Sequence, residues 1–434
     1  MPRRCSPRRA GASEVTFHVV GGGLAGLSAA VTLASAPGGH DVVLHEAAPR
    51  AGGRCRSWHD AELGVEIDNG THALLGANPQ ALAYLARIGA EDRVHWLDGG
   101  IEFLDLRDGA RWSIRGPADM LRPWRHGGSG AAREMALLLR LLVPGQGAAV
   151  PPGLAGATGL GRLAWDPLVR SIMNTAPGTA AAMPFAAALR RILRGGARGM
   201  RVGLARRSLA DCLVDPALHL LARHGARLRL GARLREVRGG ADGALPVLHF
   251  DGEAVELARH DRAILALPPW DLARCAPGLA PDCAASPIVN LHAVLDMPDT
   301  GAGDIAFRGL VGGQVEWVLR RGRVASSTTS AAEALSGLSR EELHARLWPD
   351  MARALGLPPG ARALRWRTIV ERRATPVQDA SFEACRPGIA TAAANVLLAG
   401  DWVVPGLPCT IEAAIASGVA AADAALRSAR TARE

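Results

Sequence analysis

Residues 15–26 read VTFHVVGGGLAG, a short β-rich run that ends in three consecutive glycines. Residues 27–36 are helix formers with apolar spacing, and residues 41–45 (DVVLH) form a second β-rich run that closes at Glu46. This order predicts a strand, a tight turn, a helix and a second strand within about thirty residues. We therefore expect an α/β fold that opens with a βαβ unit.

The glycines of this stretch have the spacing Gly-x-Gly-x-x-Gly, with Gly21, Gly23 and Gly26 at the fixed positions. The first glycine permits the sharp turn, the second lets the backbone approach a pyrophosphate, and the third lets helix and strand pack closely. The N–H groups at the start of the helix then face the phosphates. Glu46 lies about 20 residues further on, where an acid can bind a pair of ribose hydroxyls and disfavours a 2′-phosphate. The stretch thus predicts a dinucleotide site.

The composition excludes several classes of protein. All 50 basic residues are Arg, and the net charge of +9 at pH 7 would suggest a nucleic-acid partner. However, only 4% of the residues are aromatic, so the chain lacks the side chains on which bases stack, and we expect no nucleic-acid binding. No run approaches the roughly 18 to 20 apolar residues of a membrane-spanning helix, which excludes an integral channel or transporter.

The N-terminal residues and the cysteines indicate the cellular compartment of the protein. Residues 1–14 are expected to form a disordered, Arg-rich leader, and the apolar run after it ends in glycines instead of a cleavage site, so we expect a cytoplasmic protein. The seven Cys are odd in number and form no Cys-x-x-Cys pair, which indicates reduced, buried thiols and no zinc site or disulfide framework. They occupy positions 5, 55, 212, 275, 283, 385 and 409.

Three further segments are typical of strands that could join the opening sheet, namely residues 233–238, 262–267 and 396–400. We therefore expect one nucleotide-binding domain assembled from three pieces of the chain. The helical and strand-rich segments between them predict an inserted α+β substrate-binding domain. The expected boundaries are 15–100, 204–275 and 370–430 for the first domain, and 101–203 and 276–369 for the second.

Three more motifs have both an ordinary and a functional interpretation. RAGGR at 50–54 follows the ribose acid, and by itself could be a flexible turn. LAGDW at 398–402 precedes PCTIEAA at 408–414, where Thr410 is a suitable N-cap and the helix after it would direct its positive end at whatever precedes it. DNGTH at 68–72 follows a short strand, although a lone His is more often structural.

Together these motifs resemble those of FAD enzymes in the amine oxidase and phytoene desaturase superfamily. The wider pattern resembles the squalene-associated FAD-dependent desaturases, now called hydroxysqualene dehydroxylases, and spans about residues 15–425. Cys409, where Ala is commoner, and His45, before the ribose acid, depart from that pattern. The additional segments that carry the resemblance are WDPL at 165–168, NTAP at 174–177, QVEWV at 314–318, ERRAT at 371–375 and RP at 386–387.

The resemblance implies an FAD cofactor held by a discontinuous, amine oxidase-like Rossmann-type domain. It implies that the Gly-Asp pair lies by the phosphate and ribityl chain, that the helix after Thr410 faces the N1–C2=O edge of the flavin, and that residues 68–72 pass the isoalloxazine ring. His72 is therefore the candidate catalytic residue, as proton donor or as a group that positions the flavin. The implied cofactor-binding residues are Gly21, Gly23, Leu24, Ala25, Gly26, Glu46, Gly52, Gly53, Arg54, Asn69, Gly70, Thr71, Val237, Gly400, Asp401, Thr410 and Ile411.

The resemblance also implies a reductive reaction, in which reduced FAD gives hydride from N5 to an allylic carbon of hydroxysqualene as the hydroxyl leaves as water. The product would be squalene for hopanoid biosynthesis. A carotenoid desaturase of the phytoene type, with hydride moving from substrate to flavin, stays open. A flavin amine oxidase is disfavoured because such enzymes typically place a Lys by flavin N5, and a non-catalytic flavin-binding protein is disfavoured because the ring-edge motifs are intact.

A long-chain isoprenoid is nearly insoluble, so we expect peripheral contact with the inner face of the cell membrane. Residues 135–143 and 185–194 form apolar helices with Arg at their edges, and each could lie in the headgroup layer or line the substrate cavity. The sequence does not identify the electron donor that reduces the flavin, the oligomeric state or the group that protonates the leaving hydroxyl.

Overall fold

The computed structural model describes residues 15–119, 130–143, 148–151, 165–240, 245–301 and 304–431. The leader predicted for residues 1–14 lies outside the described residues, as does Cys5. Among the described cysteines, which are all free thiols, Cys283 is half-buried and Cys385 is exposed, so the prediction that all are buried is wrong for these two.

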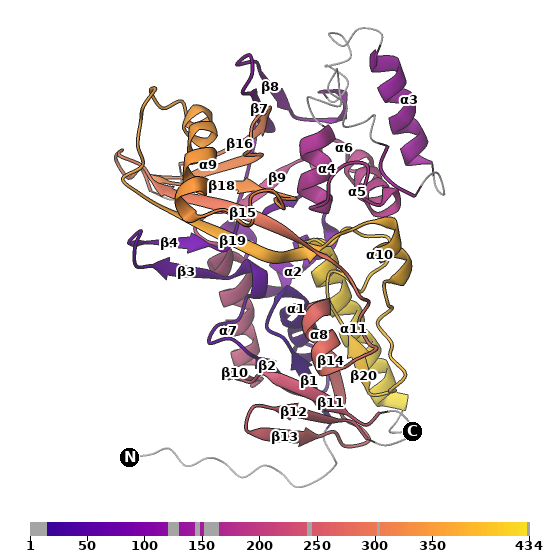
Figure 1. Cartoon of the computed structure of the whole chain (residues 1–434). Helices are drawn as coiled ribbons and strands as arrows, with labels where there is room; N and C mark the ends of the chain where they lie inside the picture. Colours follow the sequence, from indigo (N-terminus) through magenta and orange to yellow (C-terminus); the bar gives the residue numbers. More distant parts are fainter. Residues whose placement is uncertain are drawn as a thin grey trace, which may run out of the picture.

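A five-stranded parallel sheet forms the lower half of the molecule in Figure 1. Its strands come from three stretches that are far apart in the sequence, and β1 lies at the centre between β2 and β14. The predicted βαβ opening and the mixed α/β class are confirmed. In spatial order the strands are β10 (Arg227–Leu230), β2 (Asp41–Glu46), β1 (Thr16–Val20), β14 (Arg262–Leu265) and β20 (Val396–Leu398).

One of the three later strands expected in this sheet lies elsewhere. β11 (Leu234–Arg238) pairs with β12 (Val247–Phe250), which pairs with β13 (Glu253–Glu256), in a separate antiparallel sheet. Its expected place is taken by β10, which reads RLRL and is exposed along its whole length. Because β10 is an edge strand, it needs no buried apolar run, so no hydrophobic pattern marks it in the sequence.

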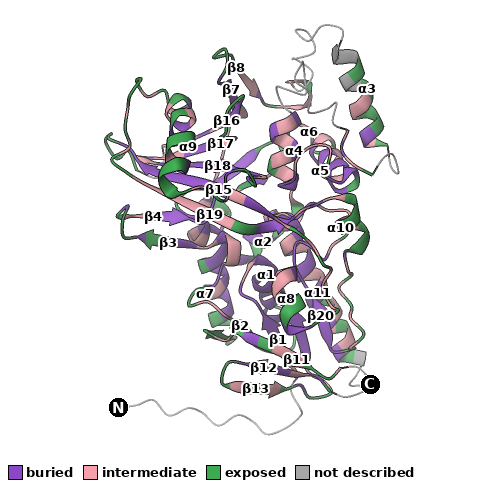
Figure 2. Ribbon diagram, viewed as in Figure 1, coloured by how far each residue is buried: buried purple, intermediate pink, exposed green. Residues whose placement is uncertain are grey.

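Helices α1 (Leu24–Ala34) and α11 (Ile411–Thr431) pack together against the parallel sheet (Figure 1). All eleven residues of α1 are buried, as its purple colour in Figure 2 shows. The close approach depends on Gly418 of α11, since a Cβ there would overlap the carbonyl oxygen of Ala25 and the hydroxyl of Ser28. The other helices of this half are α2 (Pro79–Ile88), α7 (Asp215–Arg223) and α8 (Pro269–Cys275).

A mixed seven-stranded sheet forms the upper half of the molecule, with α9 (Arg340–Leu355) packed on one face (Figure 1). The capping box of Ser339 and Glu342 fixes the start of α9, and its Leu343, Leu347 and Met351 are buried against the sheet. The order is β19 (Arg365–Pro376), β15 (Ala285–Val294), β18 (Val324–Thr329), β17 (Trp317–Arg321), β16 (Ile305–Val311), β7 (Ile101–Asp105) and β8 (Arg111–Ile114).

Smaller elements join the two halves. Two antiparallel sheets lie between them, one of two strands and one of three. The strands are β3 (Ser57–Asp60), β4 (Val65–Asp68), β5 (Ala73–Leu75), β6 (Val94–Trp96) and β9 (Val202–Ala205). The remaining helices are α3 (Gly130–Leu142), α4 (Asp166–Met173), α5 (Ala182–Arg194), α6 (Gly196–Gly199) and α10 (Ala380–Cys385).

The domain boundaries stay a prediction, and two of them fall inside strands. The boundary at 203/204 cuts β9, and the boundary at 369/370 cuts β19. Both strands therefore continue from one predicted domain into the other. Within the described ranges, no helix is both long and apolar enough to cross a membrane.

Candidate active site

A single continuous cavity of about 730 Å³ extends from the carboxyl end of the parallel sheet to the underside of the seven-stranded sheet. Its lower end is lined by the two glycine turns and by the residues before α11. Its upper end is lined mainly by apolar side chains, which are Ile101, Leu168, Ile172, Ile192, Val202, Phe307 and Trp317. Ligands of doubly wound sheets bind at this edge, beyond the carboxyl ends of the strands.

The first glycine turn is built as its spacing predicts. Gly21 has φ +109°, a conformation that favours glycine, and its N–H donates to the carbonyl of His45 at 2.7 Å. A Cβ on Gly26 would overlap the carbonyl oxygen of Gly21, so this position must stay bare for α1 to pack on β1. Gly23 is the N-cap of α1 and offers no side chain, so the first N–H groups of the helix are left for an anion.

Glu46 is held rigidly at the end of β2. Its two carboxylate oxygens accept hydrogen bonds from the backbone N–H groups of Gly22 and Ala48, each at 2.6 Å. Glu46 also lines the cavity. The remaining lone pairs of its oxygens can accept hydrogen bonds from ribose hydroxyls, as the sequence predicts.

The second glycine motif packs directly on the first. The N–H of Gly52 donates to the carbonyl of Gly22 at 2.7 Å, and a Cβ on Gly53 would lie 3.0 Å from the Cα of Gly23. Gly52 has φ +114° and Gly53 has φ +55°. Glycine at both positions therefore lets the two turns form one wall of the cavity.

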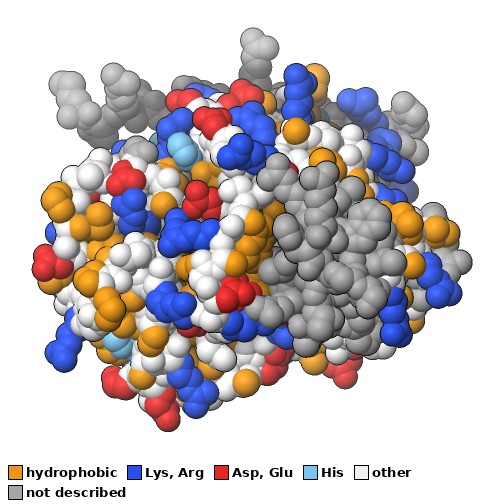
Figure 3. All heavy atoms as spheres, turned by 90° about the horizontal axis from the view of Figure 1, so that it is seen from above, with side chains coloured by type: hydrophobic (Ala, Val, Ile, Leu, Met, Phe, Trp, Pro, Cys, Tyr) orange, Lys and Arg blue, Asp and Glu red, His pale blue; other side chains and the backbone are white. Residues whose placement is uncertain are grey.

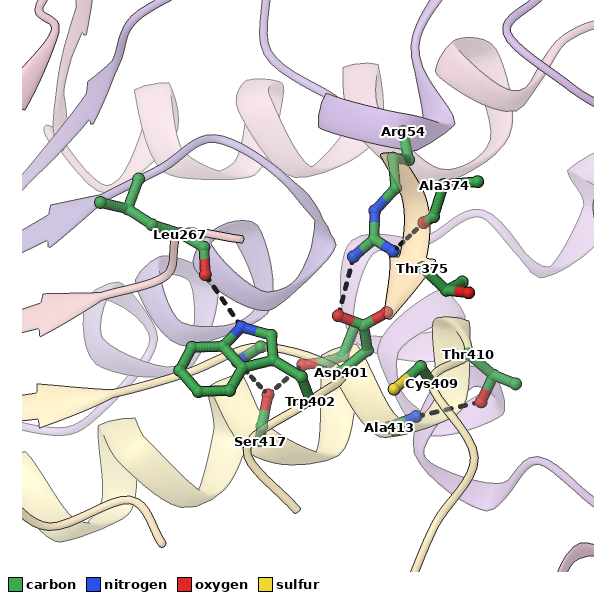
Figure 4. Close-up of polar contacts among 12 residues, drawn as sticks. Arg54, Leu267, Ala374, Thr375, Asp401, Trp402, Cys409, Thr410, Ala413 and Ser417 are labelled. Atoms are coloured by element: carbon green, nitrogen blue, oxygen red, sulfur yellow. Dashed lines mark hydrogen bonds and ion pairs between the residues drawn. The ribbon is translucent and has the colours of Figure 1, made fainter. Parts of the chain in front are cut away.

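Arg54 links the N-terminal and C-terminal motifs. Its guanidinium donates to Asp401 at 2.7 Å and to the carbonyl of Ala374 at 2.6 Å, as Figure 4 shows. Burial alone would lower the pKa of Arg54, but the adjacent Asp401 carboxylate raises it above its ordinary value. Asp401 is buried, and Gly400 before it is anchored because its N–H donates to the hydroxyl of Ser417 at 2.8 Å.

The N-terminus of α11 points into the same cavity. Thr410 is its N-cap, because its hydroxyl accepts a hydrogen bond from the N–H of Ala413 at 3.5 Å (Figure 4). Thr410, Ile411 and Cys409 line the cavity, and burial raises the pKa of the Cys409 thiol well above its ordinary value. The N-terminus of α11 carries a partial positive charge, which favours a negatively charged ligand group next to it.

Residues 69–72 also line this cavity. Asn69 Oδ1 and Thr71 Oγ1 are buried and have no hydrogen-bond partner among the described residues. Since buried polar atoms are nearly always paired, these two atoms indicate that a polar ligand belongs here. His72 also lines the cavity, and burial lowers its pKa, so that its imidazole is neutral at pH 7.

The structure brings nearly all of the predicted site residues to this cavity. Gly26 lies behind the wall, where its function is helix packing, and Val237 does not line the cavity. A bulge between Leu234 and Glu236 shifts the register of β11, and Val237 pairs with Leu248 of β12. Leu234, at the start of the strand, lines the cavity instead.

Several residues that line the cavity were not predicted individually. Asn290 donates to the carbonyl of Asn69 at 3.3 Å and accepts from the hydroxyl of Thr328 at 2.8 Å. Asn174 donates to the hydroxyl of Thr375 at 3.0 Å. Asn174 and Thr375 lie in segments that carried the family resemblance, but Asn290 and Thr328 had no motif to mark them.

The residues present fit FAD. The glycine turns and the start of α1 form a cradle suited to a pyrophosphate, Glu46 can accept from ribose hydroxyls, and the unpaired atoms of Asn69 and Thr71 are available to a polar ligand group. The upper end of the cavity is lined mainly by apolar side chains, which suit a hydrophobic substrate. Fold and site together define an FAD-dependent oxidoreductase.

Comparison with known proteins agrees with this class. The profile of the flavin containing amine oxidoreductases matches residues 24–143, 152–295 and 318–426. The hydroxysqualene dehydroxylase of Zymomonas mobilis is 36% identical over 420 residues, which cover 94% of this chain and 98% of that protein. That of Rhodopseudomonas palustris is 35% identical over 422 residues, which cover 96% and 99%. The chain therefore belongs to the flavin-containing amine oxidoreductase family, within the group of the hydroxysqualene dehydroxylases.

Two more distant similarities complete the comparison. Cyclohexylamine oxidase from Brevibacterium oxydans has the same fold, with a TM-score of 0.69 at 14% identity over 97% of this chain and 100% of that one. The 15-cis-phytoene desaturase of Narcissus pseudonarcissus is 38% identical, but over only 100 residues, which are 23% of this chain and 17% of that protein.

Proposed function

We propose that the protein removes the hydroxyl group of hydroxysqualene reductively and releases squalene. The observation that carries this proposal is the full-length similarity to hydroxysqualene dehydroxylases, in a chain whose cofactor cradle opens directly into an apolar chamber. The similarity to phytoene desaturases covers less than a quarter of the chain, so the desaturase alternative has weaker support.

The chamber suits a reaction that passes through an allylic cation. Bound FAD, once reduced, supplies the hydride. Ile172, Ile192 and Val202 exclude water that would recapture the cation, and the stacked rings of Phe307 and Trp317, whose centroids are 5.0 Å apart, add polarisable π electrons to the wall. The N-terminus of α11 stabilises negative charge at the lower end of the cavity.

The direct test uses the FAD-loaded, photoreduced protein under anaerobic conditions. We expect hydroxysqualene to reoxidise the flavin and to yield squalene. Phytoene should remain unchanged and leave the flavin reduced. Flavin absorbance follows reoxidation, and chromatography identifies the product. If the oxidised protein instead desaturates phytoene and ignores hydroxysqualene, the proposal is wrong and the desaturase alternative is correct.

We further propose that the protein takes its substrate from a membrane surface, with α3 as the contact. Leu139 of α3 is 57% exposed, Val143, which follows the helix, is 50% exposed, and Met183, in the first turn of α5, is 51% exposed. Figure 3, which views this end of the molecule, shows basic and hydrophobic side chains side by side. Further along α5, Leu189 and Ile192 are buried, which favours the interpretation that α5 lines the cavity.

The double substitution Leu139→Glu with Val143→Glu should weaken binding to anionic vesicles roughly tenfold, because it replaces two half-exposed apolar side chains. Co-sedimentation with phosphatidylglycerol vesicles measures the effect. Leu364→Glu, at a site that is 55% exposed immediately before β19, is the matched control and should bind as the wild type does. Equal binding of the double variant and the wild type would exclude α3 as the contact.

A further inference from the structure

Glu316 is a buried carboxyl group directly behind the wall of the apolar chamber. Its backbone is fixed within the seven-stranded sheet, because its N–H donates to the carbonyl of Thr328 at 3.1 Å and its carbonyl accepts from Leu310 at 2.7 Å. The next residue, Trp317, lines the chamber. In the described part of the chain, no Arg or His lies within ion-pair distance of the Glu316 carboxyl group. Burial of an ionised carboxyl group without a cation is unfavourable, so a protonated state and a function for Glu316 must be considered.

Ser330 connects this carboxyl group to the chamber. Its backbone N–H donates to Glu316 Oε2 at 3.0 Å, and its hydroxyl lies close enough to the carboxyl group to lower the pKa of Glu316. Ser330 lines the chamber, whereas Glu316 does not. A hydroxyl can donate one proton while it accepts another, so Ser330 can pass a proton between the buried acid and a molecule in the chamber.

The loop that carries Ser330 is held in a strained conformation. Ala331 and Asn174 are the described non-glycine residues with positive φ, at +46° and +43°. They are joined directly, because the N–H of Ala331 donates to Asn174 Oδ1 at 2.7 Å. Such backbone strain persists where surrounding contacts enforce it, and it clusters at functional sites.

The same contacts connect the Ser330 loop to the second glycine motif. Asn174 donates to the hydroxyl of Thr375 at 3.0 Å, and Thr375 follows Ala374, whose carbonyl accepts from Arg54 at 2.6 Å. Backbone and hydrogen bonds thus link the Ser330 loop to Arg54, and both Ser330 and Arg54 line the cavity.

Burial lets Glu316 keep a proton to about neutral pH. Burial raises the pKa of Glu316 to about 7, and the hydrogen bonds from Ser330 act in the opposite direction. From α4, Arg170 lowers this pKa and Asp166 raises it. From α9, Asp350 approaches the same segment, where it accepts from the N–H groups that precede Glu316. Burial lowers the pKa of His72, which disfavours the imidazolium form that would be the stronger acid.

We propose, on the basis of the proposed function, that Glu316 is the proton source for the departing hydroxyl group and delivers its proton through Ser330. The C–O bond of the substrate breaks with its electron pair on oxygen, which takes the Ser330 proton and leaves as water. Ser330 takes the proton of Glu316, and the allylic carbon forms its new C–H bond with hydride from the reduced flavin, which is oxidised. Glu316 is left as a carboxylate and regains a proton from solvent.

The test is a single-turnover measurement with photoreduced, FAD-loaded protein and hydroxysqualene across the neutral pH range. The wild-type rate should fall above about pH 7, as Glu316 loses its proton. Glu316→Gln should bind FAD with an unchanged absorbance spectrum, react roughly a hundredfold more slowly and lose this pH dependence. Glu316→Asp should keep part of the rate and the pH dependence, and Ser330→Ala should slow the reaction as Glu316→Gln does.

Two further measurements separate a structural effect from proton delivery. Glu102→Gln removes an exposed carboxylate that pairs with Arg308 in the same sheet, and should leave the rate and its pH profile unchanged. The infrared band of a protonated carboxylic acid should be present in the wild type at mildly acidic pH and absent from Glu316→Gln. A Glu316→Gln protein with the wild-type rate and pH profile would overturn the inference alone, whereas failure of the wild type to form squalene would overturn the proposed function and the inference with it.

Discussion

Arg54→Met is expected to yield a colourless protein whose free energy of unfolding is lower by about 3 kcal/mol. Arg54 pairs with Asp401 at 2.7 Å, and the Asp401 side chain is only 4% exposed, so the substitution leaves a buried carboxylate without its cation. It also removes the contact that joins the second glycine motif to the C-terminal motif. The flavin absorbance of the purified protein and its urea denaturation curve measure the two effects.

The double variant Arg54→Met with Asp401→Leu separates stability from cofactor binding. Because it replaces both charges by apolar groups, it should recover most of the lost stability and still bind no FAD. Arg235→Met is the matched control, since Arg235 and Asp251 form an exposed pair, and it should leave the free energy of unfolding nearly unchanged. If Arg54→Met stays yellow and as stable as the wild type, the pair has no function in the site.

Gly26→Val is expected to weaken FAD binding by roughly a hundredfold, which corresponds to about 3 kcal/mol. Its Cβ would overlap the carbonyl oxygen of Gly21 and lie 3.3 Å from the Cβ of Ala266. Backbone cannot move aside as a flexible side chain can, so the start of α1 must withdraw from the phosphate cradle. Titration of the apoprotein with FAD, followed by flavin fluorescence, measures the dissociation constant.

Gly337→Val is the control for this substitution. Gly337 is exposed, and a Cβ there meets nothing within 4 Å, so this variant should bind FAD with wild-type affinity. Gly26→Ala should fall between Gly26→Val and the wild type. Tight FAD binding by Gly26→Val would show that the turn does not depend on close packing of α1 against β1.

The lower half of the cavity could be predicted because its parts are local. A glycine turn, an acid at a fixed distance after it and an N-capped helix are each specified by a few neighbouring residues. Gly21, Glu46 and Thr410 can therefore be recognised from the sequence alone. The structure confirms the α/β class and lines one cavity with these three residues. Their contacts with FAD stay predictions.

The features that could not be predicted depend on pairing between segments that are distant in the sequence, and local sequence patterns do not indicate such pairing. The exposed β10 has no apolar run, yet it occupies the edge of the parallel sheet, and Val237, which follows a bulge in β11, does not line the cavity. Glu316 stood in a segment that carried the family resemblance, but nothing in its neighbours showed that it would be buried beside Ser330. Such placements follow from tertiary packing and register.

The packing of α1 against α11 has a consequence for synthesis of the chain on the ribosome. Every residue of α1 is buried, and part of its cover comes from a helix that begins at Ile411, near the end of the polypeptide. A nascent chain must therefore be synthesised as far as α11 before α1 is shielded. In that interval the exposed α1 is prone to aggregation, so removal of α11 should lower the solubility of the newly made chain.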